Sequence, residues 1–164
     1  MTGSPGPRPF SWPLRVYTQH TDAGGVVFHA TYLHFFERAR MEWMRDRGFD
    51  ARELAAKFGL VFIVRQLEVA YLKPALLDDL VMVSADVQEM GRAQLTFAQE
   101  VRRDGGSERE VLVRASINVA CVLAHSLKPA PFPEPIRASL TDAAQPTGEK
   151  ISRSVQPRGD ASRV

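Results

Sequence analysis

The residues best suited to catalysis lie in one short string, Thr-Asp-Ala-Gly-Gly-Val-Val-Phe-His-Ala-Thr-Tyr, at positions 21–32. Asp22 and His29 stand on either side of Gly24 and Gly25, where an extended pattern gives way to a helical one. Glycine lets the backbone approach a ligand closely, and the first turn of a helix has N–H groups without intrahelical partners. A carboxylate beside such donors is the minimum equipment for acyl transfer.

A long helix is predicted directly after this string. Positions 30–47 contain neither Gly nor Pro, and large apolar side chains recur there at helical spacing. Such a broad aromatic face belongs to a helix that other structure wraps, and Gly48 supplies the usual end. A shorter helix is predicted at 51–58 and a short strand at 14–17. The apolar face of the long helix consists of Tyr32, Leu33, Phe35, Phe36, Ala39, Trp43 and Met44.

Positions 60–123 alternate with a period of two, which is typical of β-strands. The alternating segments are 66–71, 81–88, 94–101 and 111–123, and turn residues separate them. This pattern predicts four long antiparallel strands that curl around the long helix, an α+β architecture. The helix buries one face of such a sheet, so we expect a second copy of the chain to cover the edges and the remaining apolar surface.

Length, charge and cysteine content narrow the class of protein. The 164 residues suit one domain, and 21 basic residues nearly balance 19 acidic ones. The net charge of +2 is scattered rather than gathered in a stripe, which argues against a nucleic-acid partner. No apolar stretch reaches the length of a membrane span. The single cysteine, Cys121, excludes an internal disulfide, so the expected compartment is the cytoplasm.

Both ends of the chain differ in composition from the middle. Residues 1–11 are rich in Pro and Gly and lack the apolar stretch of a signal peptide, which predicts a disordered leader. Prolines at 129, 131, 133 and 135 interrupt regular structure, and the chain then becomes polar. We therefore expect a folded domain over 12–133 and a polar, flexible tail over 134–164.

The order of these elements and several strings of residues resemble a known family. A short strand, a long aromatic helix and four long antiparallel strands resemble the hotdog fold. The Asp-Ala-Gly-Gly-Val-Val-Phe-His string looks like that of the bacterial YbgC acyl-CoA thioesterases, within the wider 4-hydroxybenzoyl-CoA thioesterase group. The similarity covers residues 12–133, and further matching strings lie at 15–17, 36–40, 62–65, 74–79, 91–97 and 119–122.

The resemblance implies an enzyme that hydrolyses an acyl-CoA to a free acid and CoA. Asp22 matches the family's catalytic carboxylate, which either attacks the thioester carbonyl or activates the attacking water, and the sequence does not choose between these roles. The backbone N–H of His29 matches the group that points at the thioester oxygen, and its imidazole is a further candidate. The expected substrate-binding residues around them are Gly24, Gly25, Val26 and Val27.

The same resemblance sets expectations for partners. No cofactor is expected, because CoA is part of the substrate. Lys73 and Arg92 are candidates for contact with the CoA phosphates, although charged strand ends in solvent are the simpler reading. The family pattern implies a dimer or tetramer, with a homotetramer as the expected assembly, and active sites at a subunit interface. It also suggests a link to an acyl carrier protein or to the Tol-Pal envelope system.

Other readings of these residues stay open. Asp is a favoured helix cap, so Asp22 has a structural alternative, and a histidine at a helix start is often only structural. A non-catalytic hotdog scaffold that binds acyl-CoA or acyl carrier protein has no need of Asp22. A dehydratase of the same fold would carry a different arrangement of His and carboxylate. The sequence has no Gly-x-Ser-x-Gly elbow and no metal-ligand spacing.

One segment departs from the family pattern. Many YbgC proteins have a Tyr and two acidic residues ahead of the motif, where this chain has Thr18, Gln19 and His20. The change removes a phenol and acidic charge from the approach to the site. We hypothesise that His20 adds positive charge to an entrance that receives anionic acyl-CoA.

Overall fold

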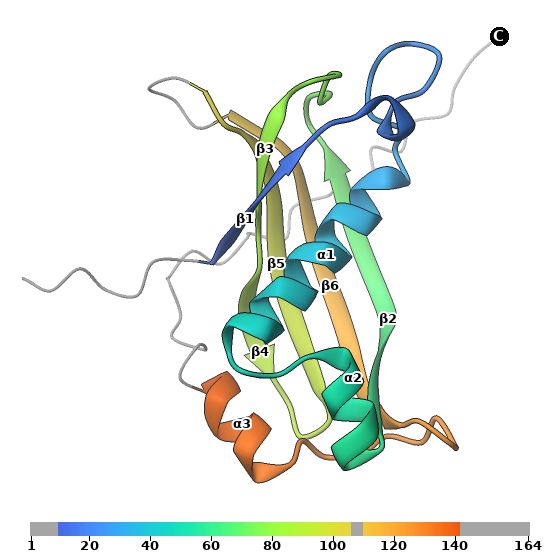
Figure 1. Cartoon of the computed structure of the whole chain (residues 1–164), viewed down its shortest axis with the longest axis vertical. Helices are drawn as coiled ribbons and strands as arrows, with labels where there is room; N and C mark the ends of the chain where they lie inside the picture. The colour runs from blue at the N-terminus through green and yellow to red at the C-terminus, as the bar shows by residue number, and fades with distance from the viewer. Residues whose placement is uncertain (1–9, 106–109, 142–164) are drawn as a thin grey trace, which may run out of the picture.

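One antiparallel sheet wraps along one long helix in the computed structural model, which describes residues 10–105 and 110–141 (Figure 1). The strands lie in the order β1-β3-β5-β6-β2, with β4 beside β5. This arrangement confirms the predicted α+β class. The strands are β1 Ser11–Arg15, β2 Leu60–Tyr71, β3 Leu80–Ser84, β4 Asp86–Met90, β5 Gln94–Arg103 and β6 Glu110–Leu123. The helical segments are η1 Thr18–His20, α1 Thr31–Asp46, α2 Ala51–Glu53, η2 Leu54–Phe58 and α3 Glu134–Thr141.

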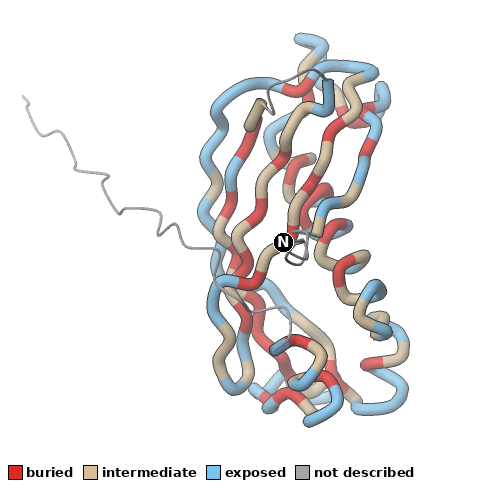
Figure 2. The backbone as a smooth tube through the Cα atoms, turned by 90° about the vertical axis from the view of Figure 1, so that its left-hand side faces the viewer, coloured by how far each residue is buried: buried red, intermediate tan, exposed pale blue. Residues whose placement is uncertain are grey.

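Helix α1 supplies the centre of the hydrophobic core. Its predicted apolar face is confirmed, since Phe35, Phe36 and Trp43 are at most 1% exposed. The Trp43 ring meets Phe97 of β5 edge-on, with ring centroids 5.1 Å apart. Buried positions recur along both the strands and this helix (Figure 2). The sheet and α1 therefore share one core, which fixes where the residues before α1 lie.

The strand pattern is confirmed in outline and corrected in two places. The strand predicted at 81–88 is divided at Ala85 into β3 and β4, and only β3 pairs with β1. The strand predicted at 14–17 lies earlier, at Ser11–Arg15, and includes Pro13. Proline lacks the N–H that a central strand needs, but β1 is an edge strand, where that loss is tolerated.

Strand β2 is the other edge of the sheet, and much of its apolar surface is uncovered. Among the described residues it pairs only with β6. Val64, Leu67 and Tyr71 are 47%, 42% and 50% exposed. A long apolar edge strand of this kind invites pairing with another strand.

The predicted domain boundaries are wrong at both ends. Helix α3 lies inside the predicted tail, and its side chains Ile136 and Leu140 are each only 2% exposed. Pro135 does not prevent this helix, because it occupies the first turn, where no intrahelical N–H bond is required. At the other end, Phe10 packs against the core and Ser11 begins β1. The remainder of the predicted leader and tail, residues 1–9 and 142–164, lies outside the described residues.

Candidate active site

Asp22 lies in a tight turn that leads into α1. The turn is closed by a bridge between Thr21 and Val27 and by a hydrogen bond from the Asp22 N–H to the Val26 carbonyl, at 2.9 Å. The carboxylate of Asp22 accepts the Gly24 N–H at 2.8 Å through Oδ1. Its second oxygen accepts no hydrogen bond from the described residues, and the side chain is exposed.

The geometry of the turn explains why glycine occupies both position 24 and position 25. A Cβ atom at Gly24 would lie 3.1 Å from Asp22 Oδ1, so a side chain there would crowd the carboxylate. Gly25 has φ +76°, a left-handed conformation that other residues adopt at a cost. The Gly-Gly pair therefore shapes the turn around Asp22.

The alternative that Asp22 caps the long helix is excluded. The residue at the N-cap position of α1 is Ala30, and no side chain in the described part of the protein caps that end. The helix begins at Thr31, nine residues after Asp22. The carboxylate is therefore left for a role other than capping.

The backbone N–H of His29 meets no acceptor among the described residues, while its carbonyl is held by a hydrogen bond. The neighbouring N–H groups of Val27 and Phe28 bond to the carbonyls of Ala75 and His20. Within residues 10–105 and 110–141, by contrast, no acceptor meets the N–H of His29. Its carbonyl accepts a hydrogen bond from Tyr71 Oη at 2.8 Å. The imidazole is exposed and lies against the Phe28 ring, with centroids 4.3 Å apart.

The loop at residues 72–79 supports the turn from the side. Val27 donates its N–H to the Ala75 carbonyl at 2.9 Å, and Val26 forms a bridge with Leu76. The Ala75 N–H in turn donates to Tyr32 Oη, at 3.0 Å. Tyr32 and Tyr71 thus hold the turn from two sides, and neither was predicted to do so.

An ion pair fixes this loop to the sheet. Arg103 Nε donates to Asp79 Oδ2 at 3.0 Å, and Arg103 Nη2 donates to the Pro74 carbonyl at 2.8 Å. Asp79 Oδ2 also accepts the Leu76 N–H at 2.8 Å. The two contacts of Arg103 join residues 24 and 29 positions apart, so no local pattern could have indicated them.

The two candidate phosphate contacts lie at opposite ends of the sheet. The backbone N–H of Lys73 donates to the Leu112 carbonyl of β6. Next to Arg92, the Ala93 carbonyl accepts the N–H of Cys121, which lies nine residues beyond Leu112 on the same strand. That separation corresponds to roughly 30 Å of strand. Lys73 Nζ pairs with Glu110 at 2.6 Å, and this contact lowers the pKa of the Glu110 carboxyl. Lys73 is therefore near the Asp22 turn in one chain, and Arg92 is not.

The hypothesis for His20 is contradicted. The ring is 7% exposed and packs edge-on against Phe35, with centroids 5.1 Å apart. Its Nδ1 accepts the Tyr17 N–H at 2.9 Å. Burial and the nearby Arg38 lower the pKa of His20 below its usual value. A buried imidazole that favours its neutral form does not give an entrance positive charge.

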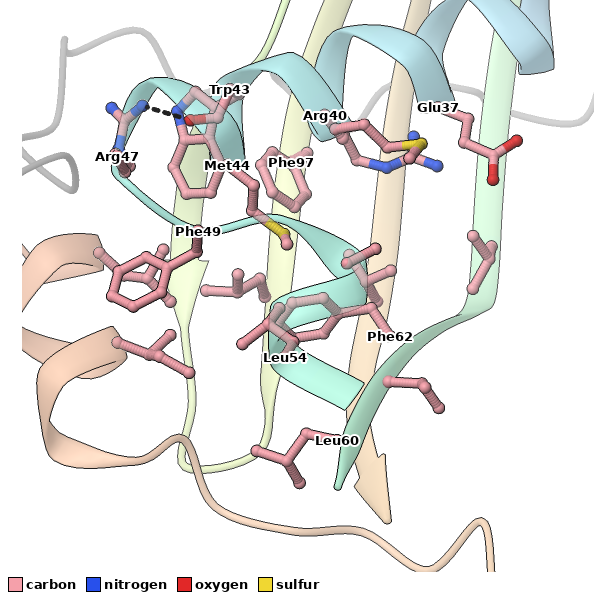
Figure 3. Close-up of a pocket in the computed structure, with 18 residues that line it drawn as sticks. Glu37, Arg40, Trp43, Met44, Arg47, Phe49, Leu54, Leu60, Phe62 and Phe97 are labelled. Atoms are coloured by element: carbon pink, nitrogen blue, oxygen red, sulfur yellow. Dashed lines mark hydrogen bonds between the residues drawn. The ribbon is translucent and has the colours of Figure 1, made fainter. Parts of the chain in front are cut away.

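A cavity of about 240 Å³ lies at the other end of α1 from the turn (Figure 3). Most of its wall is apolar and comes from α1, η2, β2, β5 and α3. Neither Asp22 nor His29 lines it. Helices α2 and α3 stand at this end of the molecule, while the Asp22 turn stands at the opposite end (Figure 1).

No group of three or more His, Cys, Asp or Glu residues is placed to hold a metal ion in the part of the chain that the structure describes. In the same part, no helix is both long and apolar enough to cross a membrane.

The sequence is similar to those of known thioesterases. The model of the thioesterase superfamily matches residues 24–110. The chain is 44% identical over 131 residues to the acyl-CoA thioesterase YbgC of Haemophilus influenzae, covering 80% of this chain and 93% of that protein. It is 40% identical over 131 residues to the acyl-CoA thioester hydrolase YbgC of Escherichia coli O6:H1, covering 80% and 95%.

Solved structures share the architecture. A probable thioesterase from Bartonella henselae aligns with a TM-score of 0.70 at 33% identity, covering 75% of this chain and 98% of that one. A Staphylococcus aureus protein solved in complex with CoA aligns with a TM-score of 0.82 at 14% identity, covering 98% and 100%, which shows the fold alone.

A curved sheet around a central helix, with an Asp-bearing turn ahead of that helix, defines a hotdog fold of the thioesterase type. On the family match and the identities above, the chain belongs to the thioesterase superfamily, in the branch of the YbgC acyl-CoA thioesterases. The resemblance predicted from the sequence is confirmed.

Proposed function

We propose that the protein hydrolyses acyl-CoA thioesters to a free carboxylic acid and CoA, with Asp22 as the catalytic carboxylate and the His29 N–H as the oxyanion donor. The observation that carries this proposal is the turn before α1. It holds an exposed carboxylate by the Gly24 N–H. Two residues after the bridge that closes the turn, it presents the His29 N–H, which meets no acceptor within residues 10–105 and 110–141. The names of the YbgC relatives support the same reaction.

Two routes use these groups. In the first, Asp22 takes a proton from water while the water oxygen bonds to the carbonyl carbon, and the C–S bond then breaks to release CoA thiolate. In the second, an Asp22 oxygen bonds to the carbonyl carbon, CoA leaves, and water cleaves the resulting anhydride. In both routes the carbonyl oxygen becomes negative, and the His29 N–H stabilises that charge.

A CoA-release assay tests the proposal. Short, medium, long and aromatic acyl-CoAs are offered to the wild type and to Asp22→Asn, which keeps the shape of the side chain but not its charge. We expect the variant to lose about 10²- to 10⁴-fold in kcat, the usual contribution of a catalytic acid or base. Asp46→Asn is the matched control, because Asp46 is 68% exposed at the far end of α1.

The outcomes separate the alternatives. Equal activity in wild type and Asp22→Asn would overturn the role of Asp22. No CoA release by either protein, with binding of acyl-CoA retained, would favour the non-catalytic scaffold. Contacts of Lys73 and Arg92 with CoA phosphates stay proposals, as do the cytoplasmic compartment and links to an acyl carrier protein or the envelope system.

We further propose that the working assembly contains at least a dimer, joined through β2. The exposed apolar side chains of this edge strand need a cover, and a second β2 added antiparallel supplies it. A two-fold axis perpendicular to the sheet keeps both α1 helices on one face of the combined sheet. Met41, 42% exposed on α1, then also faces the second copy's side of the molecule. A homotetramer would pair two such dimers.

A further inference from the structure

His20 is one of two buried polar side chains in the described part of the chain, the other being Gln99. The Gln99 amide joins β5 to α1 and to β3 by its hydrogen bonds. His20 lies between β1 and the Asp22 turn, two residues before the proposed catalytic carboxylate. Burial of a polar ring is costly unless the ring is hydrogen-bonded, so the partners of His20 indicate what it does there.

The ring of His20 closes the short helical turn η1, which this residue ends. Its Nδ1 accepts the backbone N–H of Tyr17 at 2.9 Å, and its own backbone N–H donates to the Tyr17 carbonyl, also at 2.9 Å. Because Nδ1 accepts, the proton of the neutral ring lies on Nε2, on the side of the Gln19 amide. The two ends of η1 are therefore joined by two hydrogen bonds, and one of them depends on the protonation state of the ring.

The backbone of His20 is joined to the other arm of the Asp22 turn. Its carbonyl accepts the N–H of Phe28 at 3.0 Å. The Phe28 carbonyl accepts the Thr31 N–H at 2.9 Å, and this carbonyl belongs to the same planar peptide unit as the His29 N–H. Asp22 therefore follows one end of the bond between His20 and Phe28 by two residues, and the proposed oxyanion donor follows the other end by one.

The surroundings of the ring favour its neutral form. It packs against Phe35 of α1, and Arg38, three residues further along that helix, is the charged group among the described residues that acts on it. From its own segment it faces Tyr17, with ring centroids 5.9 Å apart. Burial, and then Arg38, lower the pKa of His20. A protonated ring has an N–H at both nitrogens, so Nδ1 would meet the Tyr17 N–H as a second donor and their hydrogen bond would be lost.

We propose that neutral His20 is a positioning residue of the thioesterase, which holds η1 closed through Tyr17 and so fixes where the Asp22 carboxylate lies relative to the His29 N–H. This inference rests on the proposed function and adds a dependence on pH, because the protonated ring releases η1 and CoA release then slows. His20 acts only through the turn and is not itself a catalytic residue. The effect on the rate is large, since a displacement of about 1 Å between reacting groups costs about 10²-fold.

Two substitutions separate the acceptor from the ring. His20→Phe keeps a ring against Phe35 but leaves the Tyr17 N–H without this acceptor, so kcat for CoA release is expected to fall about ten- to a hundredfold, with KM within about twofold. His20→Asn places Oδ1 where Nδ1 lies, because both atoms are bonded to Cγ, so its kcat at about pH 8 is expected to stay within about threefold of the wild-type value. Thermal unfolding identifies the variants that are folded under the assay conditions.

The pH dependence of kcat tests the neutral ring without relying on His20→Phe. Asp22 is present in both the wild type and His20→Asn, so its ionisation contributes equally to both profiles. Only the wild type gains a proton at residue 20, and it does so below the ordinary pKa of 6.5. The ratio of the wild-type kcat to the His20→Asn kcat is therefore expected to be constant between about pH 7 and 8 and to fall severalfold by about pH 5. His125→Gln, at an exposed position, is the control and should keep the wild-type profile.

The outcomes distinguish this inference from the proposed function. CoA release by the wild type, together with an unchanged kcat in folded His20→Phe, would overturn the positioning role and leave the proposed function standing. A kcat ratio that does not change with pH would overturn it as well. An equal loss of kcat in His20→Phe and His20→Asn would show that the bond to Tyr17 is not what matters. No CoA release from any acyl-CoA by the wild type would overturn the proposed function and the inference together.

Discussion

The hydroxyl of Tyr71 holds the peptide that carries the proposed oxyanion donor. It donates to the His29 carbonyl, and its ring packs against Tyr32, with centroids 5.7 Å apart. Tyr71→Phe removes only the hydroxyl. We expect kcat to fall about three- to tenfold, the effect of one lost hydrogen bond of 0.5–1.5 kcal/mol, with a smaller change in KM. Steady-state kinetics on one acyl-CoA measures both constants.

Tyr17→Phe is the control for this substitution. Tyr17 is 58% exposed, and in the described part of the chain its hydroxyl does not bond to the turn. A purely structural role for Tyr71 would lower the melting temperature without separating kcat from KM. An unchanged kcat in Tyr71→Phe would show that the hydroxyl does not position His29.

Protonation of His20 is expected to weaken the fold in acid. The unfolded chain binds this proton near the ordinary pKa of 6.5, and the folded chain binds it only at lower pH. Between these two values the unfolded state holds more protons, so the free energy of unfolding falls as the pH decreases from about 6.5. Below the lowered pKa both states bind the proton, so His20 causes no further fall in the free energy of unfolding.

Urea denaturation between about pH 5 and 8 measures this dependence. His20→Asn keeps an acceptor for the Tyr17 N–H but removes the titrating ring, so its free energy of unfolding should fall less in acid than that of the wild type. His125, which is exposed, supplies the control His125→Gln. Equal acid dependence in His20→Asn and wild type would contradict the burial argument.

At the residue scale, the sequence predicted those features of the turn that are local. Asp22, Gly24 and Gly25 lie within four positions, so their types and spacing indicated a carboxylate in a glycine turn. Tyr71 could not be found this way, because 42 residues separate it from His29. His20 was misread for a related reason, since its burial depends on Phe35 packing against it from α1.

At the scale of elements, α3 is expected to contribute to stability. Ile136→Asp would place a carboxylate among apolar side chains and should therefore release α3 from the core. The cost is limited to the free energy of docking this helix, which the burial of two aliphatic side chains sets at about 3–6 kcal/mol. Denaturant unfolding measures the change.

Ala138→Asp is the matched control for α3, because it adds the same charge at an exposed position of the same helix. We expect a change within about 0.5 kcal/mol for this variant. A similar loss in both variants would mean that helix propensity, rather than the burial of Ile136, sets the stability of α3.

The elements that the sequence predicted well are those in which apolar residues recur at a regular spacing. Helix α1 and strands β5 and β6 bury one face against the same core, so their patterns are plain. Helix α3 was missed because four alternating prolines suggested an interruption, whereas Pro135 fits the first helical turn. The division between β3 and β4 at Ala85 leaves the apolar alternation intact, so the pattern gave no sign of it.

At the scale of the whole molecule, the edge strand β2 connects assembly with activity. Its alternation predicted a buried face, yet Leu67 and Tyr71 are exposed in the single chain. A pattern shows that a face is apolar and not which partner covers it. The proposed dimer gives this face a partner and places the second copy beside the strand end that holds each Asp22 turn through Tyr71.

A charge in the middle of β2 tests this connection. Leu67 is 42% exposed at the proposed interface, so Leu67→Asp should leave the monomer folded but place two like charges close together in the dimer. We expect light scattering to show a monomer, circular dichroism to show a native-like spectrum, and CoA release to fall by at least about tenfold, because Tyr71 ties the Asp22 turn to the end of β2 and the turn loses the second copy beside it. Leu127→Asp is the control, since Leu127 is 60% exposed in the segment after β6 and its φ of +56° suits Asp. A Leu67→Asp protein that is monomeric and fully active would separate assembly from catalysis, and one that stays dimeric would place the interface elsewhere.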